Sequence, residues 1–223
     1  MKYSHVVPAT FLERPNRFVA RVRIGEAVET VHVKNTGRCR ELLIPGAEVY
    51  LEESRNPARK TKYDLVAVRK ENGLLFNIDS QAPNHVVKEW LERRQYDRII
   101  PEFTCGESRI DFYMERGTER FLMEVKGCTL EINGIGYFPD APTERGVKHL
   151  RELARAAQEG FHAILAFVIQ VDGVTEVRPN TETHPEFGLA LEAAEKAGVE
   201  ILFLSCHVEP NSIEIVSADG KSR

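Results

Sequence analysis

Short apolar runs that alternate with polar residues fill the first third of the chain. Five of them are long enough to predict β-strands, and turn residues such as Gly25-Glu26 separate them. These runs cover residues 18–24, 28–33, 47–52, 64–69 and 73–78. Short strands with turns at this spacing are typical of a small all-β barrel, and an OB-like barrel has the matching number of strands.

The spacing of apolar residues becomes helical after the turn-rich segment 79–84, which we interpret as the connector between two domains. The domains would then span residues 1–83 and 84–223. Three amphipathic helices are predicted in the second domain. They cover residues 85–94, 143–159 and 186–197. Asn84 is the expected cap of the first helix and Thr143 of the second.

Apolar runs between these helices predict the sheet that the helices cover. Residues 163–169 and 199–204 are continuously apolar, as in strands that are buried on both faces. The segment 109–127 predicts two more strands, joined by a polar turn that contains glycine. The sequence therefore predicts a small α/β sheet sandwiched by helices, with a frayed tail from Ser217.

Composition narrows the class of protein without changing this picture. Hydrophobic residues make up 42% of the chain and charged residues 29%, as in soluble globular proteins. No apolar run is long enough for a membrane helix, and the N-terminus lacks the features of a signal peptide, so we expect a cytoplasmic protein without a membrane partner. The four cysteines form no CxxC pair, and neither GxGxxG nor GxxxxGK[ST] occurs, which argues against a zinc knuckle and a nucleotide cofactor.

Charge is distributed unevenly although the net charge is only −4. Residues 1–85 contain 14 Lys and Arg against 10 Asp and Glu, whereas residues 86–223 contain 16 against 24. A mildly basic first part and an acidic second part suit a binding module joined to a metal-binding catalytic module. Chance surface composition is the alternative explanation.

Three charged residues inside the apolar strands of segment 109–127 are the candidate chemistry. Glu124 and Lys126 share one face of a strand because side chains two residues apart point the same way. Asp111 on the neighbouring strand can reach that face. Two carboxylates and a lysine at the end of a sheet are the parts of a divalent-metal phosphodiesterase site. A surface ion pair is the alternative, but unpaired carboxylates within apolar strands would be costly.

A basic loop follows the second predicted strand. Its candidate nucleic-acid-binding residues are Lys34, Asn35, Arg38 and Arg40. Arginine forks and backbone N–H groups in such a loop could contact phosphates. The alternative is a solvated turn whose arginines pair with nearby glutamates.

A helix followed by strands that carry Asp and then Glu-x-Lys resembles the PD-(D/E)XK nuclease superfamily, with Asp111 as the aspartate and 124–126 as the (D/E)xK element. The chain also resembles the sugar fermentation stimulation protein (SfsA) family along nearly its whole length. The segments that carry this resemblance are 35–38, 41–42, 45–46, 108–112, 124–130, 138–146, 148–150 and 178–180. One departure is His184, where we expect an Asp.

The resemblance implies an N-terminal OB-like domain, a C-terminal PD-(D/E)XK nuclease-like α/β domain and nucleic-acid binding. Mg²⁺ or Mn²⁺ would be held by Asp111 and Glu124, with Glu102 and the Val125 carbonyl as further ligands. Lys126 would orient the attacking water or neutralise charge in the transition state. The supporting residues of the pocket would be Asp140, Thr143, Arg145 and His149.

Two other functions stay open at this point. The protein could be a DNA-binding regulator of sugar-metabolism genes whose nuclease-like domain does not cleave, or a sugar binder in its barrel. The sequence shows no cluster of exposed aromatics with amides to favour the sugar binder. The expected partner is nucleic acid, DNA before RNA, and an exposed strand edge would allow a homodimer.

Overall fold

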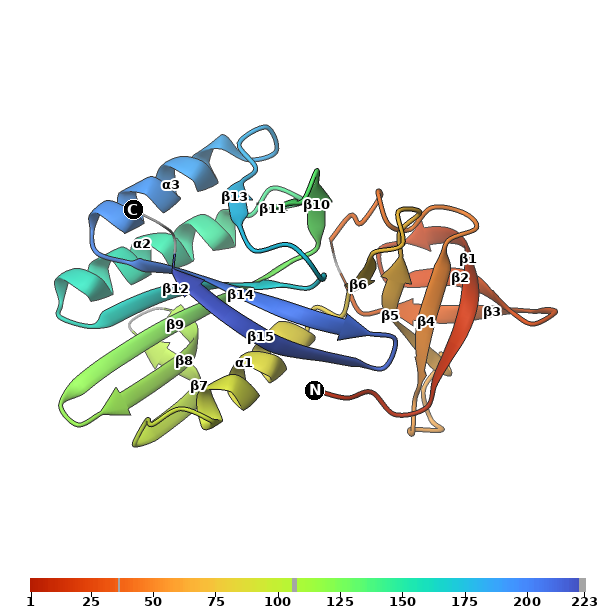
Figure 1. Ribbon diagram of the computed structural model, residues 1–223, viewed down its shortest axis with the longest axis horizontal. Helices are drawn as coiled ribbons and strands as arrows, with labels where there is room; N and C mark the ends of the chain where they lie inside the picture. The colour runs from red at the N-terminus through yellow and green to blue at the C-terminus, as the bar shows by residue number, and fades with distance from the viewer. Residues whose placement is uncertain (36, 106–107, 221–223) are drawn as a thin grey trace.

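The structure, a computed structural model, describes residues 1–35, 37–105 and 108–220. Thr36, which belongs to one of the segments of the resemblance, lies outside the described residues. The chain forms a barrel followed by a helix-covered sheet, and the two lie side by side along the long axis of the molecule (Figure 1). This arrangement brings loops of the barrel to the ends of the inner strands of the sheet.

The first domain is a closed barrel whose strands point apolar residues inward. The strands are β1 (Val6–Asn16), β2 (Val19–Ile24), β3 (Ala27–Val33), β4 (Glu48–Glu53) and β5 (Tyr63–Arg69). They are ordered β3-β2-β1-β4-β5, and a parallel pairing of β3 with β5 closes the ring. A short strand β6 (Leu75–Asn77) pairs with β5. The prediction of an OB-like barrel is confirmed.

Four of the five predicted barrel strands are confirmed, and the fifth barrel strand is β1 rather than the run 73–78. Strand β1 lies outside the predicted runs, and it contains prolines at positions 8 and 15, which are unusual in a central strand. Pro8 is tolerated since it lies opposite Tyr50 of β4, before the pairing with β2 begins at Thr10. The predicted run 73–78 is the short β6 beside the barrel rather than one of its closing strands.

The second domain is built on a mixed sheet ordered β15-β14-β12-β9-β8-β7. Its strands are β7 (Arg98–Cys105), β8 (Ser108–Arg116), β9 (Glu119–Cys128), β12 (His162–Ile169), β14 (Glu200–Glu209) and β15 (Ser212–Gly220). Strands β9, β12 and β14 run parallel and are buried in the centre, whereas β7, β8 and β15 are antiparallel additions. The predicted α/β sheet is confirmed.

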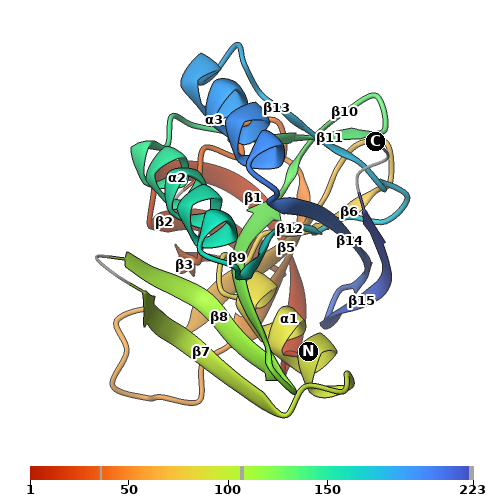
Figure 2. The ribbon, with the colours of Figure 1, turned by 90° about the vertical axis from the view of Figure 1, so that its left-hand side faces the viewer.

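Helices cover both faces of this sheet (Figure 2). They are α1 (Ala82–Glu92), α2 (Glu144–Gln158) and α3 (Pro185–Lys196). Helix α1 packs Val87 and Leu91 on one face, in a cluster with Phe112 of β8. Helix α2 packs Leu150 and Leu153 on the other face, and α3 lies beside it. Helices α1 and α2 begin at the same end of the sheet strands, and their first turns therefore lie on either side of the end of β9.

Two local predictions differ from the structure. Gln81, not Asn84, is the N-cap of α1, so the predicted domain boundary at residue 84 falls inside the first turn of that helix. The tail from Ser217 is paired with β14 as far as Gly220, because β14 presents a free edge to it. The loop 128–142 contains a small sheet. Its strands are β10 (Leu130–Ile132) and β11 (Ile135–Phe138), with β13 (Val177–Pro179) beside β11.

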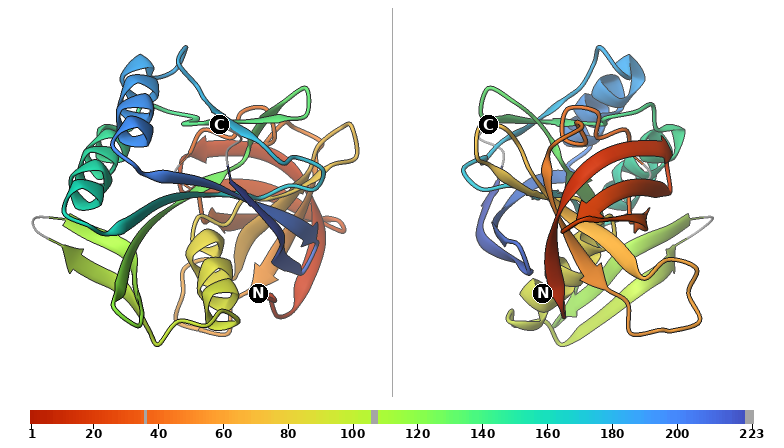
Figure 3. Two further views of the ribbon diagram at one scale, coloured as in Figure 1. Left: turned by 60° about the vertical axis from the view of Figure 1, so that its left-hand side comes forward. Right: turned by 90° about the vertical axis from the view of Figure 1, so that its right-hand side faces the viewer.

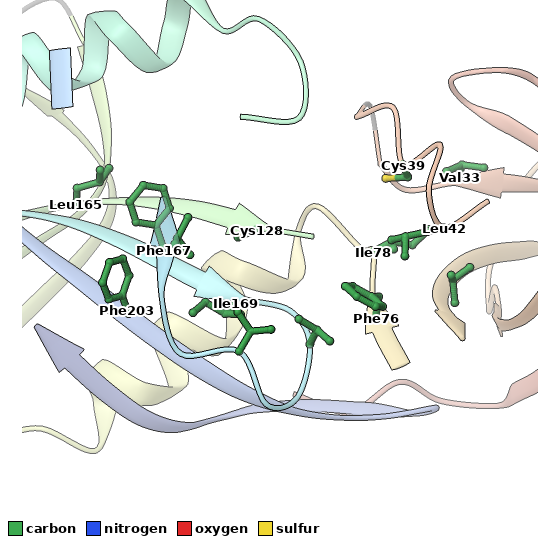
Figure 4. Packing of buried hydrophobic residues seen from close by; sticks show 14 of the residues in the cluster. Val33, Cys39, Leu42, Phe76, Ile78, Cys128, Leu165, Phe167, Ile169 and Phe203 are labelled. Atoms are coloured by element: carbon green, nitrogen blue, oxygen red, sulfur yellow. The ribbon is translucent and has the colours of Figure 1, made fainter. Parts of the chain in front are cut away.

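Apolar side chains form a continuous core from the barrel into the second domain. Figure 4 shows Phe76 and Ile78 of the barrel side facing Ile169 and Cys128 of the sheet. Buried Gln170 adds polar contacts, because its Nε2 donates to backbone and side-chain oxygens of Asn77. The two domains are therefore held in a defined orientation, which Figure 3 shows from two further sides.

Candidate metal and nucleic-acid site

The candidate site begins where β8 and β9 stop pairing. The last ladder pair between these strands is Phe112 with Met123. Beyond it, Asp111 Oδ2 accepts the backbone N–H of Val125 at 2.8 Å. Asn84 Nδ2 donates to Asp111 Oδ1, also at 2.8 Å. The Asp111 carboxylate thus replaces the next hydrogen bonds between the two strands, and Val125 and Asn84 hold it from two sides. It lies at the end of the sheet, where the sequence predicts the site.

Glu124 is the most buried carboxylate of the site, with 2% of its surface exposed. Its Oε1 contacts the Lys126 ammonium at 2.6 Å and the Nδ1 of His149. Its other oxygen, Oε2, is buried and has no hydrogen-bond partner among the residues that the structure describes. Buried polar atoms are normally satisfied, so this oxygen needs an explanation.

His149 connects Glu124 to the solvent-facing side of α2. The Nε of Arg145 donates to His149 Nε2 at 3.3 Å, so Nε2 acts as an acceptor. In the neutral imidazole the other nitrogen then carries the proton. His149 therefore donates from Nδ1 to Glu124, and Arg145 fixes this tautomer. The predicted pair Arg145 and His149 lies together at the site.

Burial and charge act differently on the two carboxylates. Burial, together with the nearby charge of Glu124, raises the pKa of Asp111 above its ordinary value. Burial also opposes ionisation of Glu124, but the hydrogen bond from His149 and the charge of Lys126 outweigh it and lower the pKa of that carboxyl. The site thus holds one firmly ionised carboxylate beside a second whose ionisation the first disfavours.

The donor set fits a divalent cation of the Mg²⁺ or Mn²⁺ kind. Such cations prefer carboxylate oxygens, and the partnerless Oε2 of Glu124 is an oxygen of this type. A cation beside Asp111 and Glu124 would also relieve the repulsion that raises the pKa of Asp111. These two carboxylates are therefore the residues that would hold a metal.

Two other metal ligands were predicted, Glu102 and the Val125 carbonyl. Glu102 on β7 lies between the ladder pairs that flank Asp111, but it is exposed, and its Oε2 pairs with Arg109 Nε at 2.5 Å. The structure therefore does not bring Glu102 to the other carboxylates. Val125 contributes its N–H to Asp111. Ligation by the Val125 carbonyl stays a prediction.

Thr143 and Asp140 stabilise the elements around the site. Thr143 is the N-cap of α2, as predicted, and its Oγ1 accepts the N–H of Gly146 at 3.0 Å. Asp140 lies at the domain junction, where its Oδ2 accepts the N–H of Arg38 at 2.8 Å. A Cβ at Gly37 would overlap this Asp140 oxygen, so the barrel loop and the 138–143 segment touch closely. Asp140 therefore joins the two domains.

The predicted nucleic-acid-binding residues separate into two kinds. Lys34 Nζ pairs with the fully buried Asp79 at 2.7 Å, and Asn35 bonds Ile78 O and Gly37 N, so both are structural. A long-range partner thus uses each side chain, and phosphate contact by these two residues stays a prediction. Arg38 and Arg40 are exposed, and neither forms an ion pair with a described residue.

Arg14 and Arg17 add to this basic surface and were not predicted. Arg14 donates to backbone carbonyls of Arg17, Asn35, Gly37 and Arg38, which shapes the loop. Arg17, Arg38 and Arg40 line a groove of about 590 Å³ together with Ala141 and Pro142 of the second domain. We call this the arginine groove. One feature of the sequence indicates this groove, namely the two arginines near the turn after β1.

Asn84 and His184 have roles that the sequence pattern did not show. Asn84 holds Asp111, and only the folded contact between α1 and β8 shows it. His184 Nδ1 accepts the N–H of Thr143 at 3.2 Å, so it links α3 to the cap of α2 where we expected an Asp. His184 also lies within 4.8 Å of carboxylates of Glu144 and Glu186. Its neutral tautomer then carries a proton on Nε2, which disfavours metal binding there.

Comparison with known proteins supports both halves of this architecture. The family model described as "SfsA N-terminal OB domain" matches residues 12–76, and that described as "Sugar fermentation stimulation protein RE domain" matches residues 81–212.

No described helix has the length and hydrophobicity needed to cross a membrane.

Relatives match over nearly the whole chain. A sugar fermentation stimulation protein homolog of Desulfitobacterium hafniense (strain DSM 10664 / DCB-2) is 53% identical over 217 residues, covering 96% of this chain and 95% of the relative. A homolog from Ruminiclostridium cellulolyticum is 49% identical over 219 residues, covering 96% of each chain. The solved structure of Pyrococcus furiosus SfsA in complex with Ca²⁺ superposes with a TM-score of 0.87 at 32% identity, covering 99% of this chain and 97% of that one.

The fold and the site define a two-domain α/β protein. An OB barrel is joined to a sheet that carries acidic residues where two of its inner strands stop pairing. The chain belongs to the sugar fermentation stimulation protein family. The resemblance seen in the sequence is thus confirmed.

Proposed function

We propose that this protein binds nucleic acid, DNA in the first place, and hydrolyses its phosphodiester bonds with Mg²⁺ or Mn²⁺, in the manner of PD-(D/E)XK nucleases. The partnerless, buried Oε2 of Glu124 beside Asp111 carries the proposal. The Ca²⁺ named for the Pyrococcus furiosus relative supports it, because Ca²⁺ also takes oxygen ligands. We also expect the protein to act in the cytoplasm, where its substrate would be accessible.

Each residue of the site has a task in this proposal. Asp111 and Glu124 would hold the cation, which when bound would supply a water of lowered pKa and neutralise charge at the phosphate. Lys126, held at 2.6 Å from Glu124, stabilises negative charge that develops on the phosphate oxygens. His149 keeps Glu124 ionised by donating to Oε1, which leaves Oε2 free for the cation.

The arginine groove would hold the nucleic-acid backbone. Arg17, Arg38 and Arg40 are exposed, and arginine forks bind phosphate oxygens in a sequence-independent way. A double variant Arg38→Ala with Arg40→Ala is expected to weaken DNA binding and to lower the salt slope of the affinity by up to about two units. A salt titration of binding in EDTA measures this. An affinity and slope equal to the parent protein's would reject the groove.

A cleavage assay tests the catalytic half of the proposal. Labelled single-stranded and duplex DNA and RNA are incubated with Mg²⁺, Mn²⁺ or EDTA, and the products are resolved by length. We expect cleavage only with a divalent cation. Asp111→Ala and Lys126→Ala should each lower the rate about 10³-fold, which corresponds to about 4 kcal/mol of transition-state stabilisation.

Lys88→Ala is the matched control, because Lys88 lies exposed on α1 and pairs only with Glu92 among the described residues. It should cleave like the parent protein. The rival function is a DNA-binding regulator that does not cleave. Salt-dependent binding without any cation-dependent product, for all four substrates, would favour that regulator and contradict a nuclease.

A further inference from the structure

A second pocket lies between the arginine groove and the candidate metal site. It has a volume of about 390 Å³ and opens where the barrel meets the edge of the sheet. Its lining includes Arg17, Thr129, Tyr137, Phe138, Asp140 and Gln170. We call it the junction pocket. Ligand pockets begin at about 300 Å³, so its size suits one small organic group.

The junction pocket shares lining residues with the arginine groove, and other residues of its lining are neighbours in sequence of the metal site. Its lining includes Pro83, Gly127 and Thr143, each within two residues of a member of the metal site. Pro83 precedes Asn84, Gly127 follows Lys126, and Thr143 begins the helix of Arg145. On the other side it shares Arg17 and Gly37, together with Ala141 and Pro142, with the arginine groove. A chain that follows the arginine groove toward the second domain therefore meets this pocket.

Gln170 presents an acceptor to the pocket. It is 2% exposed, and its Nε2 donates to Asn77 O, Asn77 Oδ1 and Asp79 O. Its Oε1 accepts no hydrogen bond from any residue within the described ranges. A Cβ at Gly127 would overlap this oxygen, so the glycine leaves the amide of Gln170 in place at the pocket wall. A buried amide with an unused acceptor can recognise an N–H or O–H donor of a ligand.

The charge of the lining determines which part of a nucleic acid fits. Arg17 lies exposed at the rim shared with the groove, while Asp140 is part of the lining. The Asp140 carboxylate would repel a phosphate inside the pocket. The partly exposed Tyr137 offers an aromatic ring for stacking, whereas the ring of Phe138 packs against Phe167 and Phe187 of the core. A neutral nucleobase with its sugar matches this lining better than a phosphate does.

We propose that the junction pocket takes one unpaired nucleotide of a single-stranded nucleic acid, with its base and sugar inside and its phosphates on the arginine groove and at the metal site. This rests on the proposed function. A base inside a duplex reaches such a pocket only after unpairing, which costs a few kcal/mol. The preferred substrate is therefore a single strand or a single-stranded end, and the base is held by stacking.

Nucleotide binding without metal tests the pocket separately from cleavage. Adenosine 5′-monophosphate and thymidine 5′-monophosphate are titrated by calorimetry, in EDTA, into the full-length Asp111→Asn protein, with maltose as a third ligand. We expect both nucleotides to bind and maltose not to bind. Maltose binding without nucleotide binding would overturn the pocket's assignment and favour a sugar site.

Tyr137 variants locate the bound base. Tyr137→Ala should weaken nucleotide and single-strand binding about tenfold, because stacking contributes about 1–3 kcal/mol per base, whereas Tyr137→Phe should retain it. Phe18→Ala is the control, since Phe18 is an exposed aromatic of the barrel outside this pocket. Circular dichroism confirms that each variant is folded. Equal affinities of folded Tyr137→Ala and the parent would overturn the proposal.

The two proposals fail in different ways. Nucleotide binding in EDTA without any cleavage in Mg²⁺ would retain the junction pocket and reject the nuclease. Cleavage in Mg²⁺, with no nucleotide binding and equal rates on single strands and blunt duplexes, would retain the nuclease and overturn the junction pocket.

Discussion

Two carboxylates, the buried Asp64 in the barrel and the half-buried Asp111 in the second domain, meet opposite surroundings. Asp64 accepts a two-pronged contact from Arg59 at 2.6 and 2.7 Å and a third from His32 at 2.8 Å. Burial opposes its ionisation, but the hydrogen bonds from Arg59 and His32 outweigh burial and lower its pKa. Asp111 accepts two neutral N–H groups, and burial together with Glu124 raises its pKa.

The difference shows where the fold uses a carboxylate for its own stability. Asp64 joins β5 to the 54–62 loop and to β3, so its ion pair helps to close the barrel. Asp111 has no cationic side chain within ion-pair distance among the described residues, and its neighbour Glu124 has a partnerless oxygen. A site that leaves carboxylates short of positive charge gives up stability that a bound cation can restore.

Replacing Asp64 should have the largest effect on stability. In Asp64→Asn, Arg59 loses an ionic partner that is 9% exposed at its side chain, and we expect unfolding to become easier by about 2 kcal/mol. Urea unfolding followed by circular dichroism measures the change. Glu13→Gln is the control, because the Glu13–Arg21 pair is more than half exposed and contributes about 0–1 kcal/mol. Equal losses in both variants would contradict a special role for Asp64.

The change in the free energy of unfolding at acid pH should be the next largest difference between the two carboxylates. The pKa of Asp64 is lowered on folding, so its contribution is present above about pH 4, its unfolded value, and is lost as pH falls through the folded value. The raised pKa of Asp111 acts in reverse, because the folded protein holds that proton more tightly and gains stability as pH falls.

Unfolding measured from pH 6 to pH 3 should therefore be less acid-sensitive in Asp64→Asn and more acid-sensitive in Asp111→Asn than in the parent. Identical slopes in the three proteins would contradict the opposite electrostatics of the two sites.

How much the sequence could predict depends on the range of the contacts. Asp111, Glu124 and Lys126 were identified because a strand's two-residue period is local, and Thr143 because a cap is local. Gln170 was missed, although a polar residue directly after a buried parallel strand is a recognisable signal for a site at that edge. The ion pair of Lys34 was missed, since its partner Asp79 lies 45 positions away and only the closed barrel brings them together.

Asp111→Asn should change metal-free stability least of all, because the amide can still accept the N–H of Val125 while Asn84 can rotate its own amide to match. Removing the repulsion from Glu124 offsets the loss of charge, so we expect a change within about 1 kcal/mol. The parent should gain about 1.4 kcal/mol when Mg²⁺ is tenfold above its dissociation constant, whereas Asp111→Asn should gain nothing. Thermal unfolding with Mg²⁺ or EDTA measures this, and Asp64→Asn, which starts less stable, should retain the full gain. A Mg²⁺-induced gain in Asp111→Asn equal to the parent's would show that the cation binds elsewhere.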